Sequence, residues 1–598
     1  MTRRLVVLRA TVVLLCLLVL GRLVQLQVIE GNRNRELADE NRIRVIRRLA
    51  PRGNIYDRRD RLLAGSRLAF SVCVVPDEVH VTGADDTAAA LAQLLSMPAD
   101  EVRKTLEGSG AARFEAAFLL REASPEVVAR LEEHSIYTSG VSVLADAVRH
   151  YPHGALAAHV LGYVREVSGD ELARPENAGY RPLDLIGKDG VEKVAEQALK
   201  GIDGGDQIEV DARGRRVRTL GTMAPQSGRS VWLTLDLDIQ QAAEEALGGR
   251  AGAVVAMDPW TGEVLAMASG PSYDPNVFVG ALSPEEWRRL SGPGHPQQNR
   301  ATTSHYPPGS LFKLVTAAAA LEAHEVSPEE RFHCSGAFRI GSWTLRCWKR
   351  SGHGDLDFTR GFAQSCNVMF STLGRRTGPE RLAEMARRFG LGARSGIDLP
   401  EEAAGLIPDP EWKRKKRSQP WYPGDTCQLA VGQGDCLVTP LQMAREVAVI
   451  ANGGTLVTPR VILRVEGEDT AVRGKRQRSV GLEPETIEAI RAGMRAVVAP
   501  GGTASRIATD RYAIAGKTGT AQAPGGQPHA WFGGYAPADD PKLVVVVVVE
   551  HGGNGSAAAA PIARHVMDAA LLPEKERPTW HAPGPPAQIS PRPAEQPL

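Results

Sequence analysis

Two reactive side chains, Ser310 and Lys313, stand three positions apart directly after the dipeptide Pro307-Pro308. Proline stops regular structure, and the residues that follow are strong helix formers with few polar side chains. We therefore expect a buried helix to begin at or near Ser310. Lys313 then projects from the same face one turn later. Burial and the positive end of the helix lower the pKa of such a lysine, which makes it a usable general base for the serine hydroxyl.

Two later segments strengthen this interpretation, because Ser-x-x-Lys alone occurs on many exposed helices. Ser365-Cys366-Asn367 and Lys517-Thr518-Gly519-Thr520 follow, so the chain carries Ser-x-x-Lys, Ser-x-Asn and Lys-Thr-Gly in that order. The penicillin-binding proteins and serine β-lactamases build their active site from these three motifs. The chain resembles that superfamily, the penicilloyl-serine transferases.

Further segments resemble the penicillin-binding protein 2 group, the class B transpeptidases specific to cell elongation. These segments are residues 52–58, 431–434, 438–442, 513–522 and 529–532. The resemblance spans most of the chain. It implies a peptidoglycan D,D-transpeptidase that cross-links stem peptides ending in D-Ala-D-Ala and is covalently inhibited by β-lactams. A division-specific class B transpeptidase, a D,D-carboxypeptidase and a β-lactam-binding scaffold or sensor stay open as alternatives.

Each residue of the three motifs has a chemistry that suits one step of such a reaction. Ser310 is the expected nucleophile, which attacks a peptide carbonyl to give an acyl-enzyme, and Lys313 takes its proton. Ser365 is suited to relay a proton to the leaving amine, and Asn367 can hold the substrate amide through both faces of its carboxamide. Lys517 adds positive charge. This chemistry requires no cofactor.

The residues after Lys517 are the expected substrate-binding residues. The hydroxyls of Thr518 and Thr520 suit a terminal carboxylate, and Gly519 lets the substrate lie against the strand as an added β-partner. The backbone amides of Ser310 and Thr520 are the expected oxyanion hole. The resemblance implies that these residues lie on an edge strand beside the Ser310 helix.

Three thiols and one imidazole between the first and second motifs form a candidate metal site. They lie within about thirty residues and can complete a tetrahedral zinc site of the structural type. Such a site would hold the second motif in position, because Cys366 lies inside that motif. Some members of the penicillin-binding protein 2 group hold zinc at this place through Asp, His and Cys. The candidate ligands are Cys334, Cys347, His353 and Cys366.

The sequence leaves an alternative to zinc open. In an oxidising compartment a Cys334–Cys347 disulfide is the natural competing interpretation. Thiols replace the family's carboxylates here, so the ligand set is open as well, and His333 is a substitute candidate. Cys427 and Cys436 are expected to lie outside the site.

Length and composition set the broad class of the chain. With 598 residues, 43% hydrophobic residues and a formal net charge of +1, it is a globular protein too long for a single core. A charge near zero gives no support for nucleic-acid binding. Seven scattered cysteines are too sparse for a disulfide scaffold.

Residues 1–28 are predicted to form a short cytoplasmic segment followed by a transmembrane signal anchor. It is basic up to Arg9 and continuously apolar over residues 10–21, with an apolar stripe that continues past Arg22. No small-x-small cleavage site follows, which favours an uncleaved anchor over a cleaved signal peptide. Arginine distribution alone places the large domain in the cytoplasm, whereas the resemblance places it in the periplasm, with one pass through the inner membrane.

The expected fold class is α+β and multidomain. Residues 29–230 alternate short strand-like and helical patterns and resemble the family's elongated, dimerisation-like pedestal domain. Residues 231–572 form the expected transpeptidase domain. Strand patterns near both of its ends, 253–267 and 543–549, enclose helical ones, which predicts an antiparallel sheet flanked by helices, as in β-lactamases. Residues 573–598 are rich in proline and are expected to be disordered.

The resemblance also implies partners. The chain shows no N-terminal domain with glycosyltransferase-like catalytic carboxylates, so glycan polymerisation is expected from a separate SEDS-family polymerase. The donor is a peptidoglycan stem peptide on glycan derived from a lipid-linked precursor, and the acceptor is an amine on a second strand. Other elongation-complex proteins, the membrane and β-lactams complete the expected partners, and nucleic acid is not among them.

Overall fold

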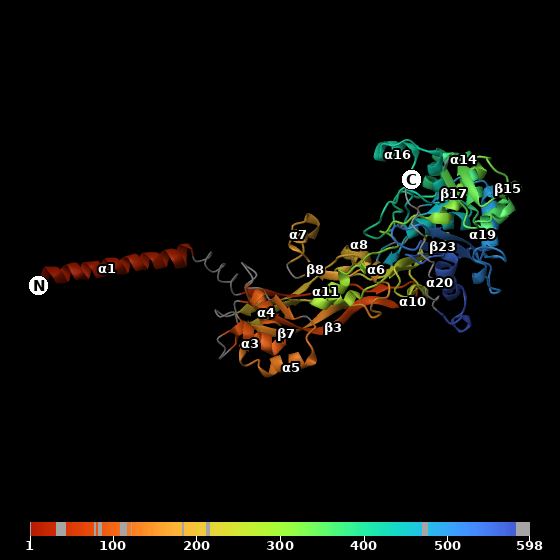
Figure 1. Cartoon of the computed structure of the whole chain (residues 1–598). Coiled ribbons are helices and arrows are strands. Elements are labelled where there is room, and N and C mark those ends of the chain that lie inside the picture. Colours follow the sequence, from red (N-terminus) through yellow and green to blue (C-terminus); the bar gives the residue numbers. More distant parts are fainter. Residues whose placement is uncertain are drawn as a thin grey trace. The chain divides into compact units, whose positions relative to one another are not determined.

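The protein is described by a computed structural model (Figure 1). It describes residues 2–30, 43–76, 79–81, 86–107, 117–120, 122–181, 184–210, 216–280, 282–341, 343–468 and 477–581. The chain divides into two compact units. Unit 1 gathers residues 1–53, 66–148 and 200–228, and unit 2 gathers residues 54–65, 149–199 and 229–598. Two N-terminal segments thus pack with the C-terminal part of the chain rather than with their sequence neighbours.

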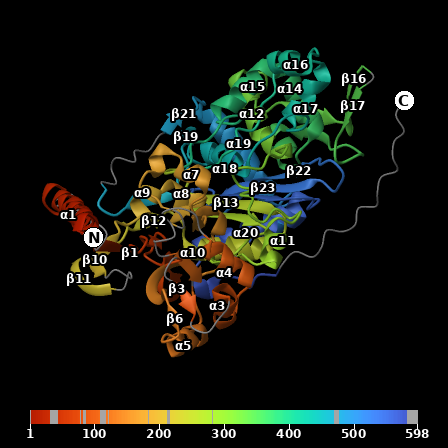
Figure 2. The same ribbon diagram turned by 90° about the vertical axis from the view of Figure 1, so that its left-hand side faces the viewer.

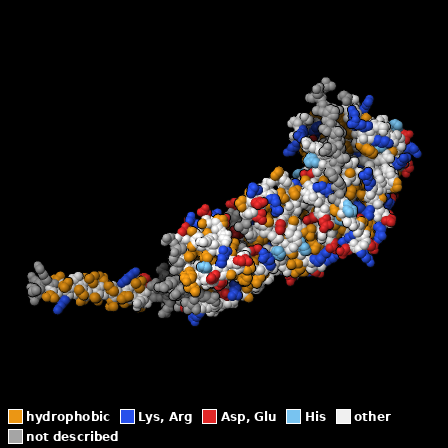
Figure 3. Space-filling view, turned by 60° about the horizontal axis from the view of Figure 1, so that its bottom comes forward, with side chains coloured by type: hydrophobic (Ala, Val, Ile, Leu, Met, Phe, Trp, Pro, Cys, Tyr) orange, Lys and Arg blue, Asp and Glu red, His pale blue; other side chains and the backbone are white. Residues whose placement is uncertain are grey.

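The N-terminal helix α1 (Thr2–Val24) continues as one π-helical turn, η1 (Gln25–Ile29). Residues Leu5–Ile29 have a mean hydropathy of 2.4, and hydrophobic side chains cover the helix along its length (Figure 3). Over the described ranges it is the one helix whose length and apolar composition suffice to cross a membrane. The apolar helix predicted at the N-terminus is therefore present.

Unit 1 contains two main sheets and a layer of short helices. In one sheet β1, β10 and β11 pair in that order, and in the other β3 pairs with β5 and β7. The helices bury Leu91, Val102 and Leu131 in one core cluster with Val72 of β3. The bounds are β1 (Ile43–Arg48), β3 (Leu62–Val74), β4 (His80–Val81), α3 (Thr87–Leu95), α4 (Ala99–Leu106), β5 (Ala117–Leu120), α5 (Pro125–Glu133), β6 (Thr138–Ser139), β7 (Val141–His150), β10 (Gly204–Val210) and β11 (Arg216–Met223).

Unit 2 begins with short elements that join distant parts of the chain. β2 (Ile55–Tyr56) pairs in parallel with β12 (Val231–Leu233), which pairs antiparallel with β20 (Ile462–Val465). His159 is buried here and bonds a backbone carbonyl through Nε2, so it has a packing role. The other short elements are α6 (Ala158–Leu161), β8 (Val164–Glu166), α7 (Gly169–Leu172), η3 (Pro175–Asn177), β9 (Leu185–Gly187), α8 (Gly190–Val194) and α9 (Glu196–Leu199).

The centre of unit 2 is a five-stranded sheet in the order β14-β13-β24-β23-β22. Every neighbouring pair is antiparallel, which confirms the predicted sheet. All side chains of β24 are buried, as its Leu-Val run predicts for a strand covered on both faces. The strands are β13 (Gly252–Met257), β14 (Val264–Gly270), β22 (Ala515–Ala521), β23 (His529–Ala536) and β24 (Leu543–Val549).

Helices pack on this sheet and form a subdomain beside it. α10 (Leu237–Leu247) and α20 (Gly555–Leu571) pack on each other and on the sheet, and α18 (Pro440–Ala451) contacts β13, β23 and β24. In Figure 2 the green to teal helices α12, α14, α15 and α17 lie together. The subdomain helices are α12 (Lys313–Glu322), α13 (Phe358–Ala363), α14 (Asn367–Thr377), α15 (Pro379–Arg388), α16 (Pro410–Arg417), α17 (Pro423–Ala430) and α19 (Pro484–Val498).

Small strands and turns complete unit 2. β15 pairs with β18, β16 with β17 and β19 with β21, all antiparallel. Of the tail predicted to be disordered, residues 582–598 lie outside the described residues. The bounds are η4 (Pro275–Phe278), α11 (Pro284–Leu290), η5 (Gly309–Phe312), β15 (Arg331–Cys334), β16 (Ala337–Ile340), β17 (Trp343–Arg346), β18 (Gly354–Asp357), β19 (Thr455–Val457), β21 (Gln477–Ser479), η7 (Ser505–Ile507) and η8 (Glu574–Glu576).

The helix that follows Ser310 is buried along nearly its whole length. α12 contains four consecutive alanines, Ala317–Ala320, which are at most 3% exposed. Helices α14, α15 and α19 all contact α12. Small side chains allow such close approach of helix axes, so this run sets how tightly the subdomain packs around the helix.

The turn before α12 is held by backbone contacts that only glycine permits. The Gly309 amide donates a 2.8 Å hydrogen bond to the carbonyl of Gly432. Gly432 has φ +69°, and a Cβ on it lies 2.1 Å from the Gly309 carbonyl oxygen. A side chain at Gly432 therefore collides with the backbone that carries Ser310.

We expect Gly432→Ala to lower the free energy of unfolding by about 3 kcal/mol, since it adds a backbone collision to the strain of a left-handed conformation. The matched control is Gly434→Ala. Gly434 also has a positive φ, of +74°, but the nearest atom to its Cβ is the flexible Gln428 Oε1 at 3.1 Å. We expect a loss of about 1 kcal/mol for the control. Unfolding of both variants by calorimetry measures the difference, and equal losses contradict the collision.

Candidate active site

The first motif lies at a junction between two kinds of helix. Ser310 belongs to the 3₁₀ turn η5, and α12 begins at Lys313, which confirms the predicted helix start. Ser310 and Lys313 are three positions apart at this junction, which places their side chains on the same face of the chain. Ser310 is half-buried, whereas Lys313 is fully buried.

The Lys313 amine joins the first motif to the second. Its Nζ donates to the Ser365 carbonyl oxygen at 2.9 Å, to Ser365 Oγ at 3.0 Å and to Asn367 Oδ1 at 2.8 Å. The Phe370 ring lies beside it, with its centroid 5.1 Å from Nζ. Every polar partner of this buried amine thus comes from the second motif, among the residues that the structure describes.

The second motif occupies a strained turn between α13 and α14. Ser365 has φ +51°, a left-handed conformation that a serine rarely adopts. Cys366 then caps α14, its Sγ accepting from the Met369 amide at 3.4 Å. The strained turn directs both the hydroxyl and the carbonyl of Ser365 at the Lys313 amine. Strain of this kind gathers at functional sites, where the surrounding structure holds it in place.

Burial shifts the proton affinity of both motif lysines. It lowers the pKa of Lys313 from 10.5 to about 8, although the thiols of Cys366 and Cys347 act in the opposite direction. Burial also lowers the pKa of Lys517 well below its usual range, and the charge of Lys313 lowers it further. Lys313 therefore carries a neutral fraction near neutral pH that an ordinary lysine lacks, and the neutral amine is the form that a general base requires.

The third motif lies on β22, the edge strand of the central sheet. Lys517 is fully buried, and its Nζ donates to the Thr518 carbonyl at 3.1 Å. A Cβ on Gly519 lies 2.8 Å from both Leu311 Cδ1 and Trp531 Cβ, so only glycine lets β22 approach the Ser310 turn this closely. The edge strand and the turn are thereby locked together, as the resemblance implied.

Two polar residues outside the predicted set contact the third motif. Thr503 Oγ1 lies 2.7 Å from Thr518 Oγ1, and Gln433 Nε2 donates to the Thr520 carbonyl at 3.3 Å. Thr503 follows Gly501-Gly502, and a glycine pair after a long helix was the one local signal for this loop. Thr520 itself is exposed.

The four candidate metal ligands come together. Their ligand atoms all lie within 4.8 Å of one another, and His353 Nδ1 is 3.5 Å from both Cys334 Sγ and Cys347 Sγ. A tetrahedral zinc ion with bonds of about 2.3 Å to sulfur and 2.0 Å to nitrogen places such atoms about 3.5 Å apart. A hydrogen bond between the two thiols lowers the pKa of Cys347 and raises the pKa of Cys366, so it favours the thiolate form of Cys347 alone. These residues fit a zinc ion.

The other metal-site candidates lie elsewhere. His333 is exposed on β15, and its Nδ1 pairs with Asp355 Oδ1 at 2.8 Å. The alternation of the strand turns its neighbour Cys334 inward and His333 outward. Cys427 and Cys436 are buried outside the group, and all the cysteines are free thiols in the structure.

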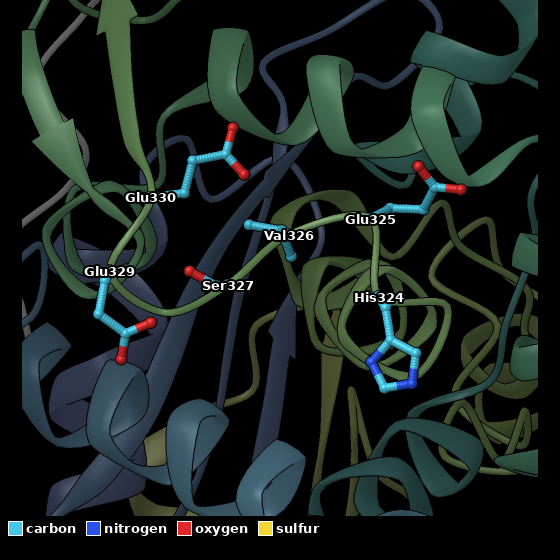
Figure 4. A pocket seen from close by; sticks show the side chains of 6 residues that line it. All are labelled: His324, Glu325, Val326, Ser327, Glu329 and Glu330. Atoms are coloured by element: carbon cyan, nitrogen blue, oxygen red, sulfur yellow. The ribbon is translucent and has the colours of Figure 1, made fainter.

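An open surface pocket follows the C-terminal end of α12 (Figure 4). The half-buried carboxylates of Glu325 and Glu330 on its wall pair with Arg381 and Arg376, respectively. No residue of the three motifs lines it. The candidate site is therefore defined by the convergence of the motifs. The lining residues are His324, Glu325, Val326, Ser327, Glu329 and Glu330.

Comparison with protein families gives two matches. Residues 252–568 match the penicillin-binding protein transpeptidase domain, and residues 47–233 match the penicillin-binding protein dimerisation domain. The peptidoglycan D,D-transpeptidase MrdA of Acinetobacter baumannii is 35% identical, covering 95% of this chain and 87% of its own length. MrdA of Haemophilus influenzae is 34% identical, covering 92% and 89%.

Solved structures agree with these matches. Penicillin-binding protein 2 of Helicobacter pylori, in a complex with MreC, superposes with a TM-score of 0.78 at 28% identity, covering 89% of this chain and 99% of that one. Pseudomonas aeruginosa PBP2, in complex with WCK 5153, has a TM-score of 0.68 at 32% identity, covering 89% and 98%. A chain of a peptidoglycan synthase complex gives 0.71 at 33% identity, covering 96% and 99%. The chain therefore belongs to the penicillin-binding protein 2 family of peptidoglycan D,D-transpeptidases.

Proposed function

We propose that this protein cross-links peptidoglycan stem peptides ending in D-Ala-D-Ala during cell elongation, through an acyl-enzyme on Ser310. The observation that carries the proposal is the buried amine of Lys313, which follows Ser310 by one helical turn and donates hydrogen bonds to Ser365 and Asn367. Relatives over nearly the full chain are peptidoglycan D,D-transpeptidases. β-Lactams act as substrate analogues that acylate the same serine.

In the acylation step, neutral Lys313 accepts the proton of Ser310 as Oγ attacks the carbonyl carbon of the penultimate D-Ala. The peptide C–N bond then breaks, and the leaving amine takes a proton through Ser365. Of the three groups bonded to Lys313, the Ser365 hydroxyl is the one that can reverse its hydrogen bond, because carbonyl oxygens only accept. Backbone amides of Ser310 and Thr520 stabilise the oxyanion. In the second step an acceptor amine attacks the acyl-enzyme.

The donor peptide binds as an added strand on the open edge of β22, beside Gly519. Asn367 holds its amide, and the amine of Lys517 with the hydroxyls of Thr518 and Thr520 supplies hydrogen-bond donors for its carboxylate. We place this chemistry in a transpeptidase domain of residues 231–572. Residues 29–230 serve as the pedestal.

The N-terminal helix anchors the protein in the inner membrane with its bulk in the periplasm, where the substrate lies. A SEDS-family polymerase supplies the glycan, and elongation-complex proteins bind the chain. Support comes from the complex of Helicobacter pylori penicillin-binding protein 2 with MreC and from a peptidoglycan synthase complex that coordinates polymerisation and crosslinking.

We also propose a structural zinc ion held by Cys334, Cys347, His353 and Cys366. The support is the fit of the four ligand atoms to a tetrahedral zinc site. Cys366 lies between Ser365 and Asn367, so a bound ion fixes the turn that holds the Lys313 amine. The ion takes no part in the acyl transfer.

Replacing Ser310 with alanine is expected to abolish covalent labelling by a fluorescent penicillin. The fold is expected to persist, because one half-buried hydroxyl contributes little to stability. Labelling is read by gel fluorescence and peptide mapping, and folding by the melting temperature. Labelling of another residue in the variant at the wild-type rate removes Ser310 from the role of nucleophile.

The rate of acylation by penicillin is expected to rise with pH and to reach half of its plateau near pH 8. The neutral amine of Lys313 is the reactive form, and it predominates above the pKa of about 8. At pH 7 about one tenth of the amines are neutral. Stopped-flow acylation between pH 6 and pH 9 measures the profile, corrected for uncatalysed hydrolysis. A flat or falling profile is incompatible with this base.

Purified protein is expected to contain one zinc ion per chain by elemental analysis. Cys366→Ser is expected to lose the ion and to melt at a lower temperature, because structural zinc contributes directly to folding. Cys427→Ser, which removes a buried thiol outside the group, is the matched control and is expected to keep the ion. Metal-free protein with a mapped Cys334–Cys347 disulfide would falsify the zinc proposal.

A further inference from the structure

An uncompensated basic surface lies beside the second motif. Residues 331–354 contain no Asp or Glu, and their basic residues are Arg331, Arg339, Arg346, Lys349 and Arg350. The last three are exposed, Arg346 at the end of β17 and Lys349 and Arg350 on the short loop between β17 and His353. Over the described ranges no acidic side chain pairs with them. Trp348 stands among them and is 60% exposed. We call Arg346, Trp348, Lys349 and Arg350 the basic rim.

The basic rim is tied to the second motif by two hydrogen bonds. Asn367 Nδ2 donates to the Arg346 carbonyl at 3.2 Å, and Trp348 Nε1 donates to the Gln364 carbonyl at 2.8 Å. The Trp348 ring also packs edge-on against His353, with centroids 5.2 Å apart. The charges and the exposed indole are therefore held at a set position beside Ser365 and Asn367.

The position of the rim matches the path of the acceptor strand. The acceptor amine attacks the acyl carbonyl from the place that the leaving amine has vacated, because the two steps are the reverse of each other. Ser365 handles the proton at that place. The donor lies along β22, which comes from a different part of the chain, so the acceptor approaches over the second motif and meets the rim.

We propose that the basic rim binds the acidic stem peptide of the acceptor strand and so selects the second substrate. This inference rests on the proposed function and adds the residues that recognise the acceptor. A stem peptide carries several free carboxylates. Arginine binds carboxylates through a planar fork of donors, and lysine adds a mobile charge. An exposed, rigid indole supplies apolar contact area at low entropic cost.

The test uses the full chain and the double variant Lys349→Glu/Arg350→Glu. Acyl transfer from a D-Ala-D-lactate depsipeptide donor is measured to two acceptors, a stem tetrapeptide and the same peptide with its carboxylates amidated. We expect the KM for the acidic acceptor to rise about tenfold, and less at high salt, because surface charge is screened. The KM for the amidated acceptor and the rate of penicillin acylation are expected to stay within twofold.

The matched control is Arg288→Glu/Arg289→Glu on α11. Its two exposed arginines also follow an exposed tryptophan, Trp287, which is 55% exposed. We expect this variant to keep the wild-type KM for both acceptors. Lys349→Gln/Arg350→Gln, which removes charge without reversing it, is expected to show a smaller rise for the acidic acceptor alone.

Three results overturn the inference. They are an unchanged KM for the acidic acceptor in both rim variants, an equal loss for the acidic and amidated acceptors, and an equal loss in the α11 variant. Penicillin acylation separates these results from a failure of the proposed function. Wild-type protein that is not acylated, or that transfers to neither acceptor, contradicts the transpeptidase itself, whatever the rim does.

Discussion

The burial of one amine organises the active site. A lysine amine removed from water is costly unless it is neutral or well bonded, and Lys313 satisfies both demands through its lowered pKa and its bonds to Ser365 and Asn367. Lys313 and Ser365 depend on each other. Ser365 keeps its left-handed backbone because the amine takes up its hydroxyl and its carbonyl together. The helix, the turn and the edge strand thus behave as one unit.

Much of this arrangement follows from local sequence. The proline pair and the helix formers after Ser310 predict the helix start, and the valine run of β24 predicts a doubly covered strand. The 3₁₀ turn and the φ of Ser365 do not follow, because they depend on tertiary contacts: the turn packs on β22 and bonds Gly432, and Ser365 bonds the Lys313 amine. Likewise, no local pattern shows that Thr503 reaches Thr518, since the packing of α19 on β22 brings the loop after the helix to that strand.

Long-range strand pairing also explains which chain segments belong to each unit, which composition alone does not predict. β2 pairs with β12, which follows it by well over a hundred residues, so residues 54–65 pack with the C-terminal unit. The candidate metal ligands show the same limit of prediction from local sequence. Their spacing suggested a shared site, but whether His333 or His353 completes it depends on strand alternation at β15, which turns His333 to solvent.

The alanine run of α12 has a consequence for the evolution of drug resistance. Three helices contact α12 and its four alanines are buried, so a larger residue at any of Ala317–Ala320 overpacks the core and destabilises the protein. Under antibiotic selection, substitutions in this buried part of α12 are therefore disfavoured as a way to shift the position of Ser310. Substitutions in the exposed loops around the site do not meet this packing constraint, so they can alter ligand contacts at a lower cost in stability.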